Sequence, residues 1–320
     1  MTRVAAIDCG TNSIRLLVAD VDLAATTLTD LDRRMEVVRL GQGVDRTGRI
    51  APDALERTLD ATRRYAEICT GFGVGPEHIR FVATSASRDA ENRQDFVDGV
   101  RQAIGVEPEV VDGDEEAALA FRGATGALEG RHPGPFLVVD LGGGSTELVL
   151  GTTSVVAAHS MDVGCVRMTE RHLHSDPPTT QEVAAASADV NAALDRAGRI
   201  VPLGRTATLV GLAGTVTTVT AHALDLDEYD PVRIDGAVLP TDKVLASCRA
   251  LLGMSHVRRT REPYMHPGRV DVIGAGALVW AVVVGRVRAE VGRAGGNLRT
   301  VVTSEHDILD GIAWSAAERV

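Results

Sequence analysis

The sequence has almost no lysine and few aromatic residues. Lys243 is the one lysine among 320 residues, and it stands in no glycine-rich loop. A Walker-type phosphate loop requires a lysine directly after its last glycine, so that class of nucleotide site is excluded. Aromatic residues make up 3% of the chain, which leaves few rings on which nucleic-acid bases could stack.

Long apolar runs and positive net charge are also lacking. The longest apolar run, near residues 275–284, is too short to span a bilayer, and the first residues show no signal-peptide pattern. The formal net charge is −11, which disfavours nonspecific binding to nucleic acid. We therefore expect a cytoplasmic protein with neither a membrane nor a nucleic acid as partner. A local group of arginines could still hold a polyanion.

The four cysteines are far apart and form no CxxC pair. They are Cys9, Cys69, Cys165 and Cys248. This spacing favours buried free thiols in a reducing compartment over a disulfide framework or a zinc site.

What the chain does contain is one short pattern used twice. An apolar run ends in an aspartate, turns through small residues and continues as a second apolar run, first in residues 5–18 and again in residues 137–149. Asp8 aligns with Asp140, and Ser13 with Ser145, at the same offset. Each copy predicts a β-hairpin with a carboxylate at its mouth and a tight turn whose backbone N–H groups face an anion.

The two turns are the main candidates for a phosphate and metal site. The residues expected to bind phosphate are Gly10, Thr11, Asn12 and Ser13 in the first copy and Gly143, Gly144, Ser145 and Thr146 in the second. Asp8, Asp140 and Glu147 offer carboxylates suited to Mg²⁺ or another divalent cation. The alternative is a pair of hairpins that need glycine only for a positive φ, but three successive glycines at 142–144 exceed that need.

The length and the repeat together predict two domains. Strand and helix patterns alternate along both halves, which favours sheets with helices on their outer faces. The Gly/Pro-rich segment 130–135 reads as a linker. The expected domains are residues 1–128 and 129–304, with a terminal helix in 305–320 that packs back on the first. Further helices are expected near residues 53–71, 165–174, 180–199, 241–252 and 269–288.

Charged segments outside the turns give further candidates. Residues 112–116 place four acids at a helix start. These suit either the helix dipole or a general base for water, and spacing does not decide which acid points inward. Arg88, after a strand near 79–84, and Arg167, at a helix start, are either fork-shaped donors to phosphate or ordinary surface arginines. The basic stretch formed by residues 258–261 and Arg269 is typical of a solvated face, although it could also guide a long polyanion.

Together these motifs resemble the exopolyphosphatase/guanosine pentaphosphate phosphohydrolase (Ppx/GppA) family, within the actin-like ATPase and sugar-kinase superfamily. The resemblance rests on residues 8–13, 41–48, 84–92, 115–117, 140–147 and 164–166. It implies an α/β fold of two actin-like (ribonuclease H-like) domains, with mixed sheets flanked by helices and a cleft between the domains.

The resemblance also implies an activity. It is the hydrolysis of the terminal phosphate of inorganic polyphosphate, with Mg²⁺ as cofactor and water as acceptor, by a homodimer. By this analogy Glu116 is the catalytic base, Asp140 and Glu147 hold the metal, and Arg88 binds phosphate. Longer members of the family continue into a helical HD-type region, whereas this chain ends at Val320, so we expect distributive action on short chains.

Three alternatives stay open at this point. The substrate could be guanosine pentaphosphate, although the few aromatic residues give no sign of a guanine pocket. The chain could be an ATP-dependent kinase, for which the glycine-rich turn at residues 211–218 is the candidate adenosine site; close packing is the other interpretation of that turn. It could also sense polyphosphate without hydrolysing it, but the joint presence of Glu116, Asp140 and Glu147 argues against that.

Overall fold

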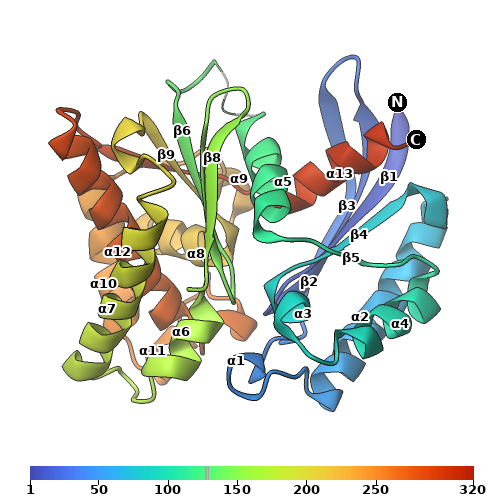
Figure 1. The fold of residues 1–320 in the computed structure, drawn as a ribbon, viewed down its shortest axis with the longest axis horizontal. Helices are drawn as coiled ribbons and strands as arrows, with labels where there is room; N and C mark the ends of the chain where they lie inside the picture. The colour runs from blue at the N-terminus through green and yellow to red at the C-terminus, as the bar shows by residue number, and fades with distance from the viewer. Residues whose placement is uncertain (127, 129) are drawn as a thin grey trace. The chain divides into compact units, whose positions relative to one another are not determined.

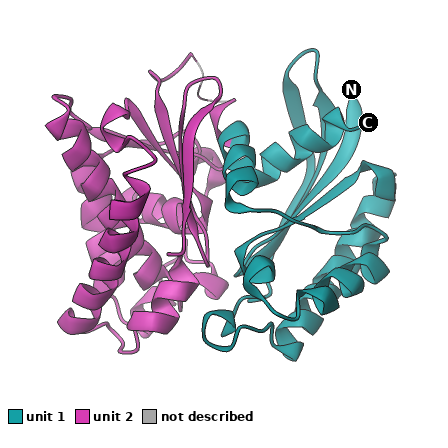
Figure 2. Cartoon of the chain, viewed as in Figure 1, with its two compact units in different colours: residues 1–123, 308–320 teal, residues 124–307 magenta. Residues whose placement is uncertain are grey.

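The structure is a computed structural model that describes residues 1–126, 128 and 130–320. The chain divides into two compact units (Figure 2). Unit 1 comprises Met1–Gly123 and Ile308–Val320, and unit 2 comprises Ala124–Asp307. The boundary expected between residues 128 and 129 touches Glu129, which lies outside the described residues.

Unit 1 is built on a five-stranded sheet in the order β3-β2-β1-β4-β5. The strands are β1 (Thr2–Cys9), β2 (Ser13–Asp22), β3 (Thr27–Val37), β4 (Ile79–Ala83) and β5 (Glu109–Val110). The first three form an antiparallel meander, while β4 and β5 run parallel to β1. The apolar run of β1 is buried because this strand lies in the middle of the sheet, whereas β3 is a polar edge strand.

Helices cover the sheet of unit 1. They are α1 (Val44–Thr47), α2 (Pro52–Gly71), α3 (Ser85–Asp89), α4 (Arg93–Ile104), α5 (Gly113–Thr125) and α13 (Ile308–Glu318), with a 3₁₀ turn η1 (Pro76–His78). Ile7 of β1 shares an apolar cluster with Tyr65 of α2 and Phe96 of α4. The terminal helix α13 packs against β1 and β2 (Figure 1). Alternate residues of β1 therefore serve two layers of core, as the period of a strand requires.

Unit 2 repeats this strand order. Its six-stranded sheet runs β10-β11-β9-β6-β7-β8, so β8-β7-β6-β9-β11 corresponds to β3-β2-β1-β4-β5 and β10 adds an antiparallel edge. The strands are β6 (Phe136–Leu141), β7 (Thr146–Gly151), β8 (Val155–Met161), β9 (Thr208–Leu212), β10 (Val238–Pro240) and β11 (Thr300–Thr303). The structure confirms the expected fold class, because both units are α/β with mixed sheets flanked by helices.

The helices of unit 2 surround one long buried helix. They are α6 (Cys165–His172), α7 (Thr180–Ala197), α8 (Ala213–Ala223), α9 (Pro231–Ile234), α10 (Thr241–Gly253), α11 (His256–Arg259) and α12 (Ile273–Arg293), with 3₁₀ turns η2 (Leu203–Arg205) and η3 (Pro267–Arg269). The alanine- and valine-rich α12 packs against α6, α7, α8 and α10, so it is apolar on most sides. It begins later than expected because residues 267–269 form η3 instead of its first turn.

All four cysteines are free and buried, as predicted.

The interpretation of residues 258–261 as a solvated face is wrong for Arg259, which is 7% exposed. Its guanidinium bonds to Asp176 at 2.7 Å and to the Val270 carbonyl at 2.9 Å. Within the described chain, no helix has the length and apolar character needed to cross a membrane.

Candidate active site

Three of the candidate segments in unit 1 follow the parallel strands β1, β4 and β5. Asp8 lies at the end of β1, Arg88 follows β4, and Glu116 follows β5. Because these strands are parallel, their carboxyl ends lie along one edge of the sheet. This edge is where ligands bind in α/β sheets. The fold therefore brings together residues that are far apart in the sequence.

Glu116 is the acid of residues 112–116 that is held at this edge. It is 7% exposed, and its Oε2 accepts a hydrogen bond of 3.2 Å from Nη1 of Arg88. The same Arg88 nitrogen donates to the Val111 carbonyl at 3.1 Å, which fixes the guanidinium against the strand end. Asp112 instead caps α5, because its Oδ1 accepts from the N–H groups of Asp114 and Glu115. Geometry thus singles out Glu116, which spacing did not.

Asp8 is paired with Arg15, a residue that sequence reasoning missed. The two are cross-strand partners on β1 and β2. Nη2 of Arg15 lies 2.6 Å from Oδ2 of Asp8, and Nε lies 2.9 Å from the same oxygen. The signal was present in the predicted hairpin, since an acid and a base flanking the turn at equal distances must face each other. The role of Asp8 as a metal ligand stays a prediction.

The first phosphate turn, residues 10–13, is held by the loop that follows β3. The Thr11 carbonyl accepts from the N–H of Gly41 at 2.8 Å, and the Asn12 carbonyl accepts from the N–H of Arg39 at 2.9 Å. A Cβ on Gly41 would collide with the Thr11 side chain, so the loop requires glycine there. In a trans peptide the C=O and the next N–H point in opposite directions. The backbone N–H of Asn12, which follows the Thr11 carbonyl, therefore points away from the supporting loop.

The second turn, residues 142–145, is held in the same way by the start of α6. The carbonyls of Gly142 and Gly143 accept from the N–H groups of Cys165 at 3.0 Å and Val166 at 2.9 Å. The Gly144 carbonyl accepts from Nε of Arg167 at 2.8 Å. Three successive carbonyls thus face α6, so the N–H groups of residues 143, 144 and 145 face the opposite side. Such a run of amides forms an anion-binding concavity.

The turns do not use Gly10 or Gly142 for a left-handed backbone, because neither residue has a positive φ. A Cβ on Gly164, at the start of α6, would collide with the Gly143 carbonyl. Gly164 and Gly41 thus occupy corresponding positions after β8 and β3, each pressed against a phosphate turn. Both belonged to the motifs of the resemblance, but their contact with the turns was not foreseen.

Hydroxyl groups of the turns are engaged within the protein. Oγ1 of Thr11 lies 2.9 Å from Oγ of Ser85. Oγ1 of Thr146 donates to the Val163 carbonyl at 2.5 Å. These two side chains therefore brace the turns. Their assignment as phosphate-binding residues stays a prediction.

The carboxylates of unit 2 are suited to Mg²⁺. Asp140 and Glu147 are partners on β6 and β7 and are 7% and 1% exposed. Oε1 of Glu147 accepts from Oγ of Ser160 at 2.8 Å. Over residues 1–126, 128 and 130–320, no three His, Cys, Asp or Glu side chains converge as a metal cage. Mg²⁺ usually takes one or two carboxylates plus water and phosphate oxygens, so this pair fits it.

The cysteines beside the turns are not nucleophiles. Burial, with the nearby Asp8 carboxylate, raises the pKa of Cys9 well above its usual value. Burial raises the pKa of Cys165 to about 11. A cysteine attacks as the thiolate, and both thiols are protonated near neutral pH. Covalent catalysis through these residues is therefore disfavoured.

The glycine-rich turn at residues 211–218 is explained by packing. A Cβ on Gly211 would lie 2.7 Å from the Trp280 ring, and one on Gly214 would collide with the Arg269 guanidinium. Nη1 of Arg269 donates to the Gly214 carbonyl at 3.1 Å. The contact of Gly211 with the buried Trp280 accounts for its glycine without any ligand, and Gly214 lies against the Arg269 guanidinium. This weakens the kinase alternative, which depended on this turn.

Comparison with known proteins shows the family of the chain. The Ppx/GppA phosphatase family matches residues 17–296. The chain is 52% identical to Exopolyphosphatase 2 of Mycobacterium tuberculosis over 99% of both proteins. The solved structure of an exopolyphosphatase-like protein matches with a TM-score of 0.95 and 45% identity over 99% of each chain. The Aquifex aeolicus member of the family matches with a TM-score of 0.79 and 27% identity over 99% of this chain and 98% of that one. With its family match covering most of its length, the chain belongs to the Ppx/GppA phosphatase family.

Proposed function

We propose that the chain is an exopolyphosphatase, which hydrolyses the terminal phosphate of inorganic polyphosphate with Mg²⁺ as cofactor. The observation that carries the proposal is the buried Glu116 carboxylate held by Arg88 at the ligand-binding edge of unit 1. The name of the M. tuberculosis relative supports the substrate class. A carboxylate in this position can accept a proton from an attacking water, as hydrolysis requires.

In this proposal Glu116 accepts a proton from water as the water oxygen bonds to the terminal phosphorus. The bond from that phosphorus to its bridging oxygen breaks, which releases the shortened chain. Phosphoryl transfer needs mainly positioning and neutralisation of charge. Arg88, bonded to both Glu116 and the Val111 carbonyl, orients the carboxylate and offers its remaining N–H groups to a phosphate oxygen. The amides of residues 143–145 supply fixed donors to phosphate oxygens. Asp140 and Glu147 would hold Mg²⁺, which would offset the negative charge of the phosphate chain.

The decisive experiment measures phosphate release from tripolyphosphate, long-chain polyphosphate, guanosine pentaphosphate and ATP side by side, with and without Mg²⁺. We expect release from polyphosphate to be fastest, and the same assay tests the expected preference for short chains. Fastest release from guanosine pentaphosphate, or transfer of phosphate from ATP to an acceptor, would overturn the proposal.

The role of Glu116 has a matched control on the same helix. Glu116→Gln should lower kcat by about 10²- to 10⁴-fold because an amide cannot accept the proton. Asp114→Asn also removes one negative charge from the start of α5, but Asp114 is exposed, so its kcat should stay near that of the wild type. Full activity in the Glu116→Gln variant would eliminate the proposed base.

A further inference from the structure

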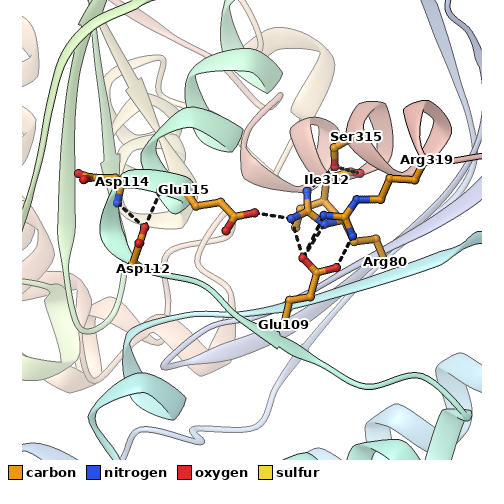
Figure 3. Close-up of polar contacts among 8 residues, drawn as sticks. All are labelled: Arg80, Glu109, Asp112, Asp114, Glu115, Ile312, Ser315 and Arg319. Carbon is orange, nitrogen blue, oxygen red and sulfur yellow. Dashed lines mark hydrogen bonds and ion pairs between the residues drawn. The ribbon is translucent and has the colours of Figure 1, made fainter.

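Arg80 is a buried cation that joins four elements of unit 1. It lies on β4 and is 4% exposed. Its Nη2 donates to Oε2 of Glu109 at 2.8 Å and to Oε1 of Glu115 at 2.5 Å. Its Nη1 donates to Oγ of Ser315 at 2.5 Å. One guanidinium thus ties β4 to β5, α5 and α13, as Figure 3 shows.

The terminal helix α13 completes this network. Ser315 can accept from Arg80 because its own hydroxyl proton is donated to the Ile312 carbonyl at 2.7 Å. Arg319 bonds to both carboxylate oxygens of Glu109, and it lies beside Arg80 in Figure 3. The two arginines hold the pKa of Glu109 below its usual value despite partial burial. Glu109 therefore stays ionised and keeps Arg80 in place.

Glu115 immediately precedes Glu116 in α5. Successive residues of an α-helix point about 100° apart, because one turn takes about 3.6 residues. The two neighbours accordingly reach different arginines, Glu115 to Arg80 and Glu116 to Arg88. Rotation of α5 about its axis would move both side chains, so a contact that holds Glu115 also restrains Glu116. The Asp112 cap fixes the end of the helix but does not by itself fix this rotation.

We infer that Arg80 is a positioning residue for Glu116, which it places by holding Glu115 and so setting the rotation of α5. A rotation of about 10° would move a carboxylate roughly 6 Å from the helix axis by about 1 Å. An error of about 1 Å in the position of a reacting group can cost about 10²-fold in rate. The inference rests on the proposed function for its kinetic consequence, but the clamp on α5 can be measured without activity.

The test uses Glu115 because loss of the buried Arg80 could prevent folding. Glu115→Met removes the acceptor of the Arg80 hydrogen bond, whereas Glu115→Gln keeps an oxygen at the same place. Both variants lose the same negative charge at the helix start, so their difference isolates the bond to Arg80. The control is Arg122→Met, which breaks another link between α5 and α13, the pair of 2.6 Å hydrogen bonds from Arg122 to Glu318.

Two readouts are needed, steady-state kinetics on tripolyphosphate and hydrogen–deuterium exchange of residues 113–118. In Glu115→Met we expect kcat to fall by about 10- to 100-fold while KM changes by less than about twofold, together with faster exchange. Glu115→Gln should keep kcat within about threefold and exchange at the wild-type rate, because its oxygen still accepts from Arg80. Arg122→Met should resemble the wild type in both readouts.

The outcomes separate this inference from the proposed function. Unchanged exchange in Glu115→Met overturns the inference, as does unchanged kcat in an active protein or an equal loss of kcat in Arg122→Met. A wild type that releases no phosphate overturns the proposed function, and the exchange comparison then still decides whether Arg80 holds α5.

Discussion

Asp140 lies directly opposite Glu147 on the antiparallel strands β6 and β7. The corresponding positions of the first hairpin hold Asp8 and Arg15, which form an ion pair at 2.6 Å. The duplicated hairpin is therefore asymmetric in charge, with an acid and a base in unit 1 and two buried acids in unit 2. Two carboxylates at opposed positions can together hold a divalent cation, which supports the proposed assignment of the metal to these residues.

The first prediction concerns Glu147→Gln. The variant removes one of the two opposed charges, and its amide oxygen can still accept from Ser160. With Mg²⁺, half-maximal activity should require a higher metal concentration because one carboxylate ligand is lost. A Mg²⁺ titration of phosphate release measures this effect.

Asp8→Asn is the comparison variant for this prediction. It breaks the Asp8–Arg15 ion pair, so it should lower stability, and its Mg²⁺ dependence tests whether Asp8 is also a metal ligand. A change of the Mg²⁺ dependence in Asp8→Asn but not in Glu147→Gln would move the metal to unit 1.

The parts of the site that sequence could predict are those encoded locally. Each hairpin is marked by an apolar run, an aspartate and a small-residue turn within about a dozen residues, and the register then follows from the turn. The choice of Glu116 over Glu115 depends instead on Arg88 of α3 and Arg80 of β4, which belong to other elements of the fold. No local pattern encodes those pairs.

Burial of charge was equally hidden from the sequence. Arg259 lies in a basic segment that looks solvated, but its partner Asp176 is 83 residues away in the chain. Arg80 is bound by Ser315, which is 235 residues away. A charged residue is buried only where the fold supplies its partners, and such partners become visible only with the tertiary structure.

The second prediction compares two glycines of the phosphate turns. A Cβ at Gly164 would collide with the Gly143 carbonyl, so Gly164→Ala must shift the second turn. We expect a loss of about 1–3 kcal/mol in the free energy of unfolding together with loss of phosphate release. A Cβ at Gly10 would meet only the Ser13 carbonyl at 3.6 Å and Oγ1 of Thr84 at 4.0 Å. Gly10→Ala should therefore keep the wild-type Tm.

A loss of phosphate release has a different meaning in the two variants, because only Gly164→Ala is expected to disturb the packing of the protein. In Gly10→Ala a fall in phosphate release at unchanged Tm would mean that substrate, and not protein packing, requires glycine at this position. If Gly10→Ala hydrolyses polyphosphate at the wild-type rate, the first turn does not hold the substrate closely.

The third prediction is a pH dependence at the end of β11. Burial, with the nearby Asp307 and Asp235, raises the pKa of Glu305, against the opposing effects of Tyr229 and Arg269. The unfolded carboxyl loses its proton at about pH 4.3, so above this pH the folded state binds more protons than the unfolded one. The free energy of unfolding therefore falls as the pH rises from about 4 to the raised pKa, and stays lower above it.

Glu305→Gln should remove this dependence. Urea denaturation between about pH 4 and pH 7 should show the stability of the variant, relative to the wild type, rising across that window. The glutamine oxygen can still accept from the Tyr229 hydroxyl, which lies 2.6 Å from Oε1 of Glu305. A stability difference that is constant with pH would mean that the Glu305 carboxyl has the same pKa in the folded and unfolded states.

The last prediction concerns the contact between α13 and α5. A Cβ at Gly311 of α13 would collide with the Leu119 carbonyl oxygen of α5, so Gly311→Ala must move one helix away from the other. We expect a loss of about 1–3 kcal/mol in the free energy of unfolding. In Gly285→Ala of α12 the new methyl group meets nothing within 4 Å. That variant should gain about 0.5–1 kcal/mol, because alanine favours a helix interior over glycine. Urea denaturation compares the stability of the two variants.

Because α5 carries Glu116, Gly311→Ala should also lower kcat. A stable, fully active Gly311→Ala variant would show that the close approach of α13 is not needed to place α5.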